Sequence, residues 1–321
     1  MTKMQHLEQI LSECGSICIG YSGGVDSVFL AVTALDVLGA NNVLAVTGRS
    51  ASYPDVQWET ARTVAREFSI PHVEIDTDEL HDANYLANPT NRCYFCKTEL
   101  WSKLAPVARE YGMNVLADGS NADDATDYRP GAQAARENNV RSPLQEAGLT
   151  KQEIRELSKA RGLPTWDQPS APCLSSRLPY GLSVTPERLK QVEEAEQIVR
   201  ELGVREFRVR HHGTIARLEV APAEMHTVMR SAQEVDARVR ALGFERAVLD
   251  VEGYRSGALN EGLKLTQLNG RKNEIAIVED SFDAARSEVP ELRNRGFRYI
   301  AIDLAHAASP QLAPEPAHND E

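Results

Sequence analysis

A glycine-rich segment near the N-terminus combines residue types that can hold a phosphate group. It reads, in order, Ser22, Gly23, Gly24, Val25, Asp26 and Ser27. An apolar run, residues 17–21, precedes it, and a helix-like stretch, residues 28–38, follows. Glycines let the backbone approach an anion, and the N–H groups at a helix start point toward it. The serine hydroxyls can donate hydrogen bonds and the aspartate can hold Mg²⁺.

The spacing of this segment resembles the PP-loop of ATP pyrophosphatases, which grip the β,γ-phosphates of ATP while a substrate attacks the α-phosphate. The Gly-Lys-Ser/Thr ending of a Walker loop is absent. An ordinary strand–turn–helix junction also uses small residues, but the complete motif favours the PP-loop. The resemblance implies ATP and Mg²⁺ as cofactors, with Asp26 as a metal ligand and catalytic residue.

A second polar segment follows a short apolar strand, residues 115–117. It contains, in order, Asp118, Gly119, Ser120, Asn121, Ala122, Asp123 and Asp124. Carboxylates at the same sheet edge as a PP-loop can hold Mg²⁺ against phosphates. We therefore expect Asp118, Gly119 and Asn121 to line the nucleotide site, and Asp123 to bind the metal. The alternative is a solvated Asn/Asp-rich turn.

Three of the five cysteines lie where sulfur chemistry is possible. Cys93 and Cys96 form a CxxC pair in a loop before a predicted helix, residues 96–111, where a helix N-terminus lowers a thiol pKa. Cys173 lies in a Pro-rich stretch. A structural zinc site needs four ligands, whereas three thiolates with one open position suit a [4Fe–4S] cluster. A reactive Cys173 beside a redox pair, or three unrelated cysteines, are the alternatives that the residues leave open.

The composition excludes several classes of protein. The chain has 321 residues and a net charge of −12, which argues against a nucleic-acid partner. No apolar run reaches the roughly 18 residues of a membrane-spanning helix, and the N-terminus lacks a signal peptide. We expect a soluble cytoplasmic protein without a membrane partner. An odd number of cysteines, five, disfavours a disulfide scaffold.

Strand and helix signals alternate through the first half of the chain. This order predicts an α/β fold with a doubly wound parallel sheet, followed by a second, smaller α+β domain. Four prolines in residues 164–181 mark the junction. The predicted parts are a PP-loop domain at 1–168, a Cys-containing junction at 169–184, an α+β substrate or oligomerisation domain at 185–270, an additional β-α-β segment at 271–304 and a disordered tail at 305–321.

Five motifs occur in an order that resembles the LarE family, the ATP-dependent sulfur transferases that build the nickel-pincer nucleotide of lactate racemase-type enzymes. They are the PP-loop, the segment 118–124, and three stretches at residues 172–181, 208–220 and 253–260. The likeness covers about residues 1–270. It implies that ATP adenylates a carboxylate of a pyridinium-dicarboxylate mononucleotide with loss of pyrophosphate. Sulfur then displaces AMP and leaves a thiocarboxylate.

The resemblance also bears on the cysteines. Some family members sacrifice one cysteine, which matches Cys173, as the sulfur source. Others carry a CxxC as well and use a three-cysteine [4Fe–4S] cluster with an extra sulfide. Cys93 and Cys96 place this chain with the second group. The family further implies a homo-oligomer, with a sulfur donor and a downstream nickel-inserting protein as partners.

A mononucleotide substrate also needs a phosphate cradle. Arg208 and Arg210 share one predicted strand face, and paired guanidiniums suit phosphate. Ser176 and Arg177 from the junction complete the candidates, and the alternative is a solvated strand face with Glu partners. Two other hypotheses compete for the function of the whole chain. One is a different PP-loop chemistry, that of a tRNA thiolase or an amide-forming synthetase. The other is a non-catalytic Fe–S or nucleotide-binding sensor.

Overall fold

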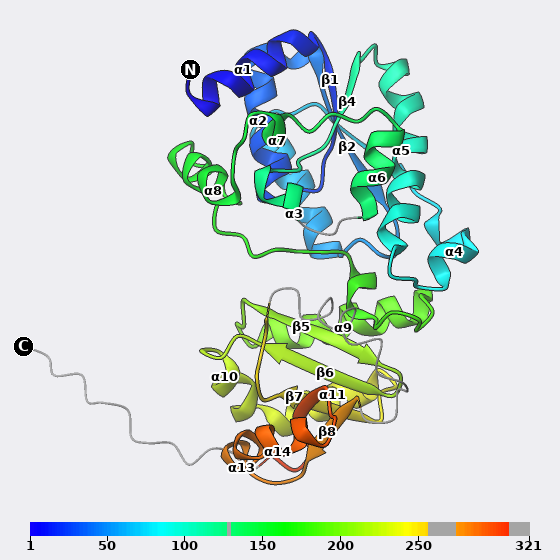
Figure 1. The fold of residues 1–321 in the computed structure, drawn as a ribbon, viewed down its shortest axis with the longest axis vertical. Helices are drawn as coiled ribbons and strands as arrows, with labels where there is room; N and C mark the ends of the chain where they lie inside the picture. Colours follow the sequence, from blue (N-terminus) through cyan, green and yellow to red (C-terminus); the bar gives the residue numbers. More distant parts are fainter. Residues whose placement is uncertain (127–129, 256–273, 308–321) are drawn as a thin grey trace, which may run out of the picture. The chain divides into compact units, whose positions relative to one another are not determined.

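The chain divides into two compact units in the computed structural model, which describes residues 1–126, 130–255 and 274–307 (Figure 1). One unit comprises Met1–Ser176 with Ser183–Pro186, and the other Arg177–Leu182 with Glu187–Glu321. The boundary therefore runs through the predicted junction. Residues 308–321, most of the tail expected to be disordered, and 256–260 of the last family motif lie outside the described residues.

The first unit is built on a four-stranded parallel sheet in the order β3-β2-β1-β4, as the α/β prediction requires. Its strands are β1 (Ile17–Gly20), β2 (Val43–Arg49), β3 (His72–Asp76) and β4 (Val115–Ala117). From β1 the chain adds β2 and β3 on one side and β4 on the other. The order thus reverses between β1 and β4, and ligands of such sheets bind at the carboxyl ends of the strands at that point.

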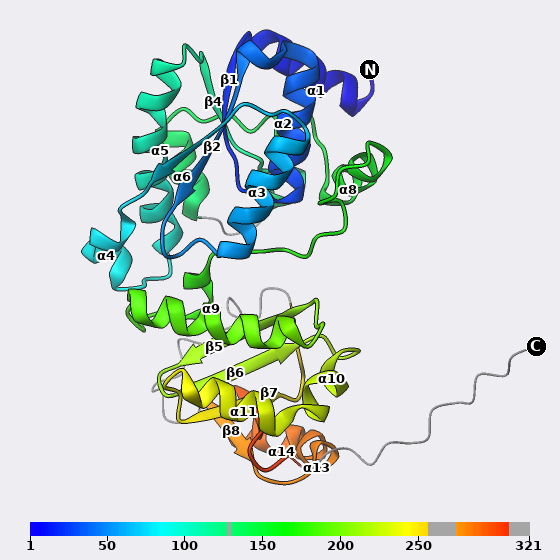
Figure 2. The same cartoon turned by 180° about the vertical axis from the view of Figure 1, so that it is seen from behind.

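Helices cover both faces of this sheet (Figures 1 and 2). Side chains alternate along a strand, so Ile17 and Ile19 of β1 join one core and Cys18 joins the other. The helices are α1 (Lys3–Cys14), α2 (Val25–Leu38), α3 (Asp55–Glu67), α4 (Ala83–Leu86), α5 (Arg92–Glu110), α6 (Pro130–Glu137), α7 (Pro143–Glu146) and α8 (Lys151–Ala160). Short 3-10 turns are η1 (Ala40–Asn42), η2 (Glu79–His81), η3 (Ala122–Thr126) and η4 (Leu174–Arg177).

The second unit is built on a mixed five-stranded sheet in the order β5-β6-β7-β9-β8. Its strands are β5 (Phe207–His212), β6 (Ile215–Val220), β7 (Arg246–Asp250), β8 (Ile275–Val278) and β9 (Tyr299–Asp303). Its helices are α9 (Pro186–Glu201), α10 (Met225–Arg230), α11 (Ala232–Ala241), α13 (Phe282–Ser287) and α14 (Val289–Asn294). The segment expected as an addition therefore supplies β8 and β9 to the same sheet.

Two predicted helices of the second unit are each divided in the structure. The helix expected over residues 222–242 is interrupted at Ser231, which forms the N-cap of α11. The helix expected over residues 281–295 is interrupted at Glu288, the N-cap of α14. Pro290 lies in the first turn of α14, where its missing N–H is tolerated, and it could not continue the preceding helix. No helix in the described ranges is long and apolar enough to span a membrane.

Candidate active site

The two predicted nucleotide-binding segments meet at the switch point of the first sheet. The PP-loop follows β1 and the acidic segment follows β4, and these strands are neighbours. Gly119 lies directly against the PP-loop, since a Cβ built on it would lie 3.0 Å from the Ser27 nitrogen. Only a glycine fits between these backbones without displacing one of them. The sequence prediction that these loops share one edge is confirmed.

The PP-loop is held in shape by its own serines. The Ser22 N–H donates to Ser27 Oγ at 3.2 Å, and the Ser27 hydroxyl donates to the Gly24 carbonyl at 3.2 Å. Gly23 has φ +63, and a Cβ on it would lie 2.7 Å from the Ala61 Cα of α3. The glycine is therefore required both by its conformation and by the close approach of α3.

Neighbouring side chains hold the carbonyl group of Ser22, the first residue of the PP-loop. The Tyr53 hydroxyl donates to the Ser22 carbonyl at 2.9 Å, and the Gln57 amide donates to the same oxygen at 2.8 Å. With this carbonyl satisfied, the loop is held by α3 and the segment before it. This arrangement preorganises the turn.

Asp26 has one paired and one unpaired carboxylate oxygen. Its Oδ2 accepts from Lys151 Nζ at 2.6 Å, whereas its Oδ1 is buried and has no hydrogen-bond partner. Burial raises the pKa of Asp26, and the Lys151 ammonium partly offsets that rise. A buried carboxylate oxygen without a donor is costly, and a cation bound there would compensate it.

The acidic segment uses most of its oxygens to hold its own fold. Asp118 Oδ1 accepts from the Ser120 N–H at 3.0 Å and from the Ser142 hydroxyl at 2.8 Å. Asn121 Oδ1 accepts from the Asp123 N–H at 3.0 Å. The Asp123 carboxylate accepts from the Lys151 N–H at 2.9 Å and so caps the start of α8. Asp118 and Asn121 thus shape the loop, and Asp123 lies beside the Asp26–Lys151 pair.

Lys151 is the site residue that sequence reasoning missed. Thr150 and Glu153 form a capping box at the start of α8, which places Lys151 at the first position of that helix. No local pattern indicates that this first turn returns to the PP-loop. The signal that could have drawn attention to it is a lysine at a marked helix start in a domain that must neutralise phosphates.

The three candidate cysteines come from two places in the first unit. Cys93 and Cys96 lie in the first turns of α5, so the prediction that they lie in a loop before a helix is wrong. The helix begins at Arg92, and not at residue 96 as predicted, so both cysteines lie within it. Cys173 directly precedes η4. None of the three forms a disulfide bond.

Hydrogen bonds fasten the Cys173 segment to the residues around α4 and α5. The Leu174 N–H donates to the Ser52 carbonyl at 2.8 Å. The Tyr85 and Ser175 hydroxyls lie 2.5 Å apart, and buried Arg92 donates to the Ser175 carbonyl at 2.8 Å. Because Arg92 directly precedes Cys93, this contact brings the Cys173 segment to the CxxC helix.

The thiols also interact electrostatically. Burial raises the pKa of Cys96, and Glu79, Cys173 and Cys93 add to that rise. Loss of water around its sulfur likewise raises the pKa of Cys93, and Cys173 adds to it. The expectation that the helix start leaves these thiols with a lowered pKa is therefore wrong for the protein without a bound ion. A positive ion among the three sulfurs would favour their thiolate forms.

The arginines predicted to bind phosphate are buried beside carboxylates. Register pairs Arg208 with Glu219 across the β5–β6 hairpin, so the strand face is as predicted. Arg177 and Glu196 form a two-pronged pair, with Nε to Oε1 at 2.8 Å, and Arg210 Nη2 lies 2.7 Å from Glu219 Oε2. The Glu partners expected in the alternative are present, but the face is not solvated.

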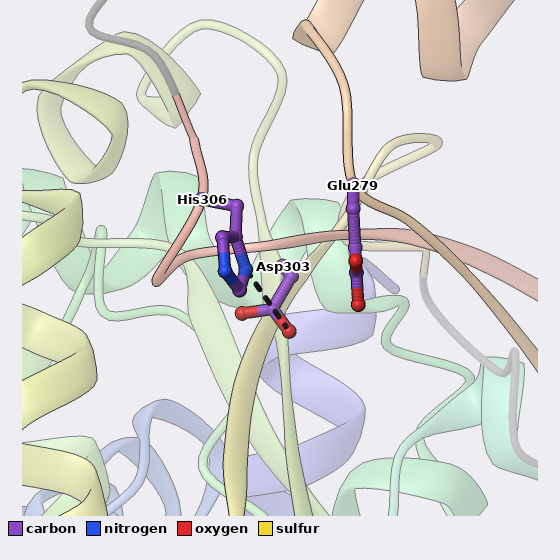
Figure 3. Close-up of side chains that lie close together, drawn as sticks. All are labelled: Glu279, Asp303 and His306. Atoms are coloured by element: carbon purple, nitrogen blue, oxygen red, sulfur yellow. Dashed lines mark ion pairs between the residues drawn. The ribbon is translucent and has the colours of Figure 1, made fainter.

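Another group of polar side chains lies in the second unit (Figure 3). Among the described residues, only Glu279, Asp303 and His306 bring three potential metal-ligand atoms within 4.8 Å of one another. Arg246 Nη1 lies 3.0 Å from a carboxylate oxygen of both Glu279 and Asp303. The guanidinium thus already compensates these carboxylates, and the group is better described as an ion-pair network around the buried Asp303. Cys93, Cys96 and Cys173 do not form such a group, so their sulfur atoms are spaced more widely than the ligands of a single ion.

Comparisons with known proteins agree with this geometry. Residues 2–95 match the family model for NAD synthase. The chain is 45% identical over 264 residues to an uncharacterised protein of Synechocystis sp., covering 82% of this chain and 98% of the relative. It is 35% identical over 267 residues to the pyridinium-3,5-bisthiocarboxylic acid mononucleotide synthase of Lactiplantibacillus plantarum, covering 83% and 97%. A third relative, an uncharacterised protein of Methanocaldococcus jannaschii, is 26% identical over 240 residues, 75% of this chain and 91% of the relative.

A parallel sheet with a PP-loop at its switch point defines the class of PP-loop, ATP-using α/β enzymes. Within that class, two relatives that match almost from end to end narrow the assignment. The chain belongs to the LarE family, that of the pyridinium-3,5-bisthiocarboxylic acid mononucleotide synthase.

Proposed function

We propose that the protein inserts sulfur into a carboxylate of a pyridinium-dicarboxylate mononucleotide at the expense of ATP. The observation that carries the proposal is the Asp26–Lys151 pair, where a buried, unpartnered Asp26 oxygen lies at the meeting of the PP-loop and the acidic segment. The name of the Lactiplantibacillus plantarum relative supplies the substrate class.

The residues of the first unit account for the activation step. A carboxylate is a poor electrophile, and transfer of AMP to it creates a good leaving group. The N–H groups at the start of α2 face the β,γ-phosphates, Asp26 holds Mg²⁺, and Lys151 adds a positive charge beside them. Together they neutralise the pyrophosphate as it leaves.

The three cysteines fit a [4Fe–4S] cluster with one iron open to a non-protein ligand. Thiols from α5 and from the Cys173 segment interact with one another, and the two remaining cysteines, Cys14 and Cys18, belong to α1 and β1. Such a cluster, when bound, supplies an exchangeable sulfide. The chain's own part is to hold Cys173 beside Cys93 and Cys96 through Arg92 and Ser175.

For the phosphate of the mononucleotide we propose Arg177, Arg208 and Arg210. Carboxylates fix the first and the last of these guanidiniums, which lowers the entropy lost when an anion binds. The Arg208 guanidinium lies over the Tyr254 ring, with 5.1 Å between Cζ and the ring centroid. Ser176, whose hydroxyl donates to the Cys173 carbonyl at 2.7 Å, stays a prediction for the same role.

The central test is turnover with the candidate substrate. The assay contains anaerobically prepared protein with its reconstituted cluster, sodium sulfide, Mg²⁺, ATP and pyridinium-3,5-dicarboxylate mononucleotide. It should yield pyrophosphate, AMP and a product in which sulfur from the added sulfide replaces oxygen, and mass spectrometry detects that product. Asp26→Asn should abolish pyrophosphate release, whereas Asp36→Asn, an exposed carboxylate on the same helix, should not. Sulfur transfer to tRNA without reaction of the pyridinium nucleotide would overturn the proposal.

The cluster has its own test. Cys93→Ala should remove the brown absorbance of the protein after anaerobic reconstitution with iron and sulfide, and buried Cys14→Ala should keep it. If instead the intact protein loses the mass of H₂S at Cys173 after turnover, the cysteine is consumed and the cluster is not the sulfur carrier.

A further inference from the structure

Glu79, which the proposed chemistry does not use, is a buried acid in a turn that packs against α5, the helix of Cys93 and Cys96. It lies in η2 and is 3% exposed. Its Oε1 accepts from the Ser50 hydroxyl at 2.5 Å and from the Ser52 hydroxyl at 2.8 Å. Its Oε2 is buried and has no hydrogen-bond partner. One half of the carboxylate is thus rigidly held and the other half is left for something that the chain does not supply.

Three observations place this carboxylate near the cysteines. The turn η2 packs against α4 and α5. Burial raises the pKa of the Cys96 thiol, and the Glu79 carboxylate adds to that rise. Ser52, which holds Oε1, also accepts through its carbonyl from Leu174, the residue after Cys173. Glu79 is therefore held next to the CxxC helix and, through Ser52, to the Cys173 segment.

The neighbouring thiols restrict what can satisfy Glu79 Oε2. A buried carboxylate oxygen requires a donor or a cation, and a cation among three thiolates is iron in the proposed cluster. The carboxylate is a harder and weaker ligand for iron than sulfide, so it can hold a coordination position and still be displaced.

We propose that Glu79 is the fourth, exchangeable protein ligand of the iron–sulfur site, occupying the open iron position until hydrosulfide replaces it. In the exchange one iron–oxygen bond breaks and one iron–sulfur bond to HS⁻ forms, and no electrons are transferred. The released carboxylate then accepts a hydrogen bond from the bound S–H. This inference rests on the cluster of the proposed function.

The test compares reconstituted wild-type protein with Glu79→Gln and with the control Asp78→Asn, a neighbouring exposed carboxylate paired with Lys103. The readouts are iron content, the electron paramagnetic resonance spectrum of the reduced cluster, and the change of that spectrum during titration with sodium sulfide. All three proteins should bind equal iron. Glu79→Gln should have a changed spectrum before sulfide is added and should bind sulfide roughly tenfold more tightly, because the competing ligand is gone.

The outcomes separate this inference from the proposed function. Equal spectra and equal sulfide affinity in the wild type and Glu79→Gln would overturn the role of Glu79 while leaving the cluster in place. Failure of the wild type to bind a cluster would overturn both. If Glu79→Gln fails to fold, the variant Glu79→Asp takes its place in the sulfide titration. It keeps the charge but shortens the side chain by one methylene, so it should show the same tightened sulfide binding, and a wild-type response would contradict the proposal.

Discussion

Asp26 and Lys151, 125 residues apart in the chain, form an ion pair with 2.6 Å between Oδ2 and Nζ. One comes from the start of α2 and the other from the start of α8. The positive ends of two helices and one ammonium are thereby directed at the place where the PP-loop closes. The pair links the nucleotide loop to a helix that sequence motifs alone did not connect with it.

Lys151→Ala should reduce the rate of pyrophosphate release by roughly 100-fold, since a positioned charge near the leaving group is lost. The fold should persist, because the Lys151 side chain is about one-third exposed, at 36%. Steady-state kinetics and thermal unfolding check both parts. Lys159→Ala, at the other end of α8, is the control and should retain its activity.

Gly23→Ala should weaken ATP binding and destabilise the first unit. Residue 23 has a φ that is unfavourable for alanine, and the added Cβ would lie only 2.7 Å from the Ala61 Cα. Gly162→Ala separates the two effects, because Gly162 has φ +69 but no atom within 4 Å of the new Cβ. We expect about 1 kcal/mol for Gly162→Ala and more for Gly23→Ala in urea unfolding. Equal losses in the two variants would show that the contact with α3 is unimportant.

The fold of the first unit was predictable from its sequence because each signal there is local. Alternating apolar runs and helices give the parallel sheet, and the PP-loop and the acidic segment each lie within a few residues. Lys151 was not predictable, since its role depends on where α8 packs. Likewise, a period of two shows that Arg208 and Arg210 share a strand face but not that the face is covered.

Arg217→Ala should destabilise the second unit by about 3 kcal/mol, because it leaves buried Asp250 and Glu219 without their common partner. Arg238→Ala, which breaks an exposed pair with Glu201, should cost less than about 1 kcal/mol. Urea unfolding of both variants measures the difference. Similar values would mean that the buried network contributes no more than a surface pair.

His211 should make the second unit less stable in acid. Burial lowers its pKa from 6.5 to about 4, so the folded state keeps it neutral where the unfolded chain takes up a proton. Stability from this group is complete above pH 6.5 and is lost as pH falls toward 4. At pH 5 the loss should be about 2 kcal/mol.

The matched variant is His211→Asn. Urea unfolding at pH 8 and at pH 5 should show a smaller difference for this variant than for the wild type. His212, which is also buried with a lowered pKa, remains in both proteins and cancels in the comparison. An unchanged pH dependence would assign the acid sensitivity to other groups.

Strand β9 pairs with β7 on one side and β8 on the other, so it closes an edge that β7 would otherwise present. A chain shortened before Ile275 would expose the unpaired N–H and C=O groups of Val248–Asp250 to any passing strand. Such a truncation should therefore yield protein that aggregates, even though every candidate catalytic residue would still be in place.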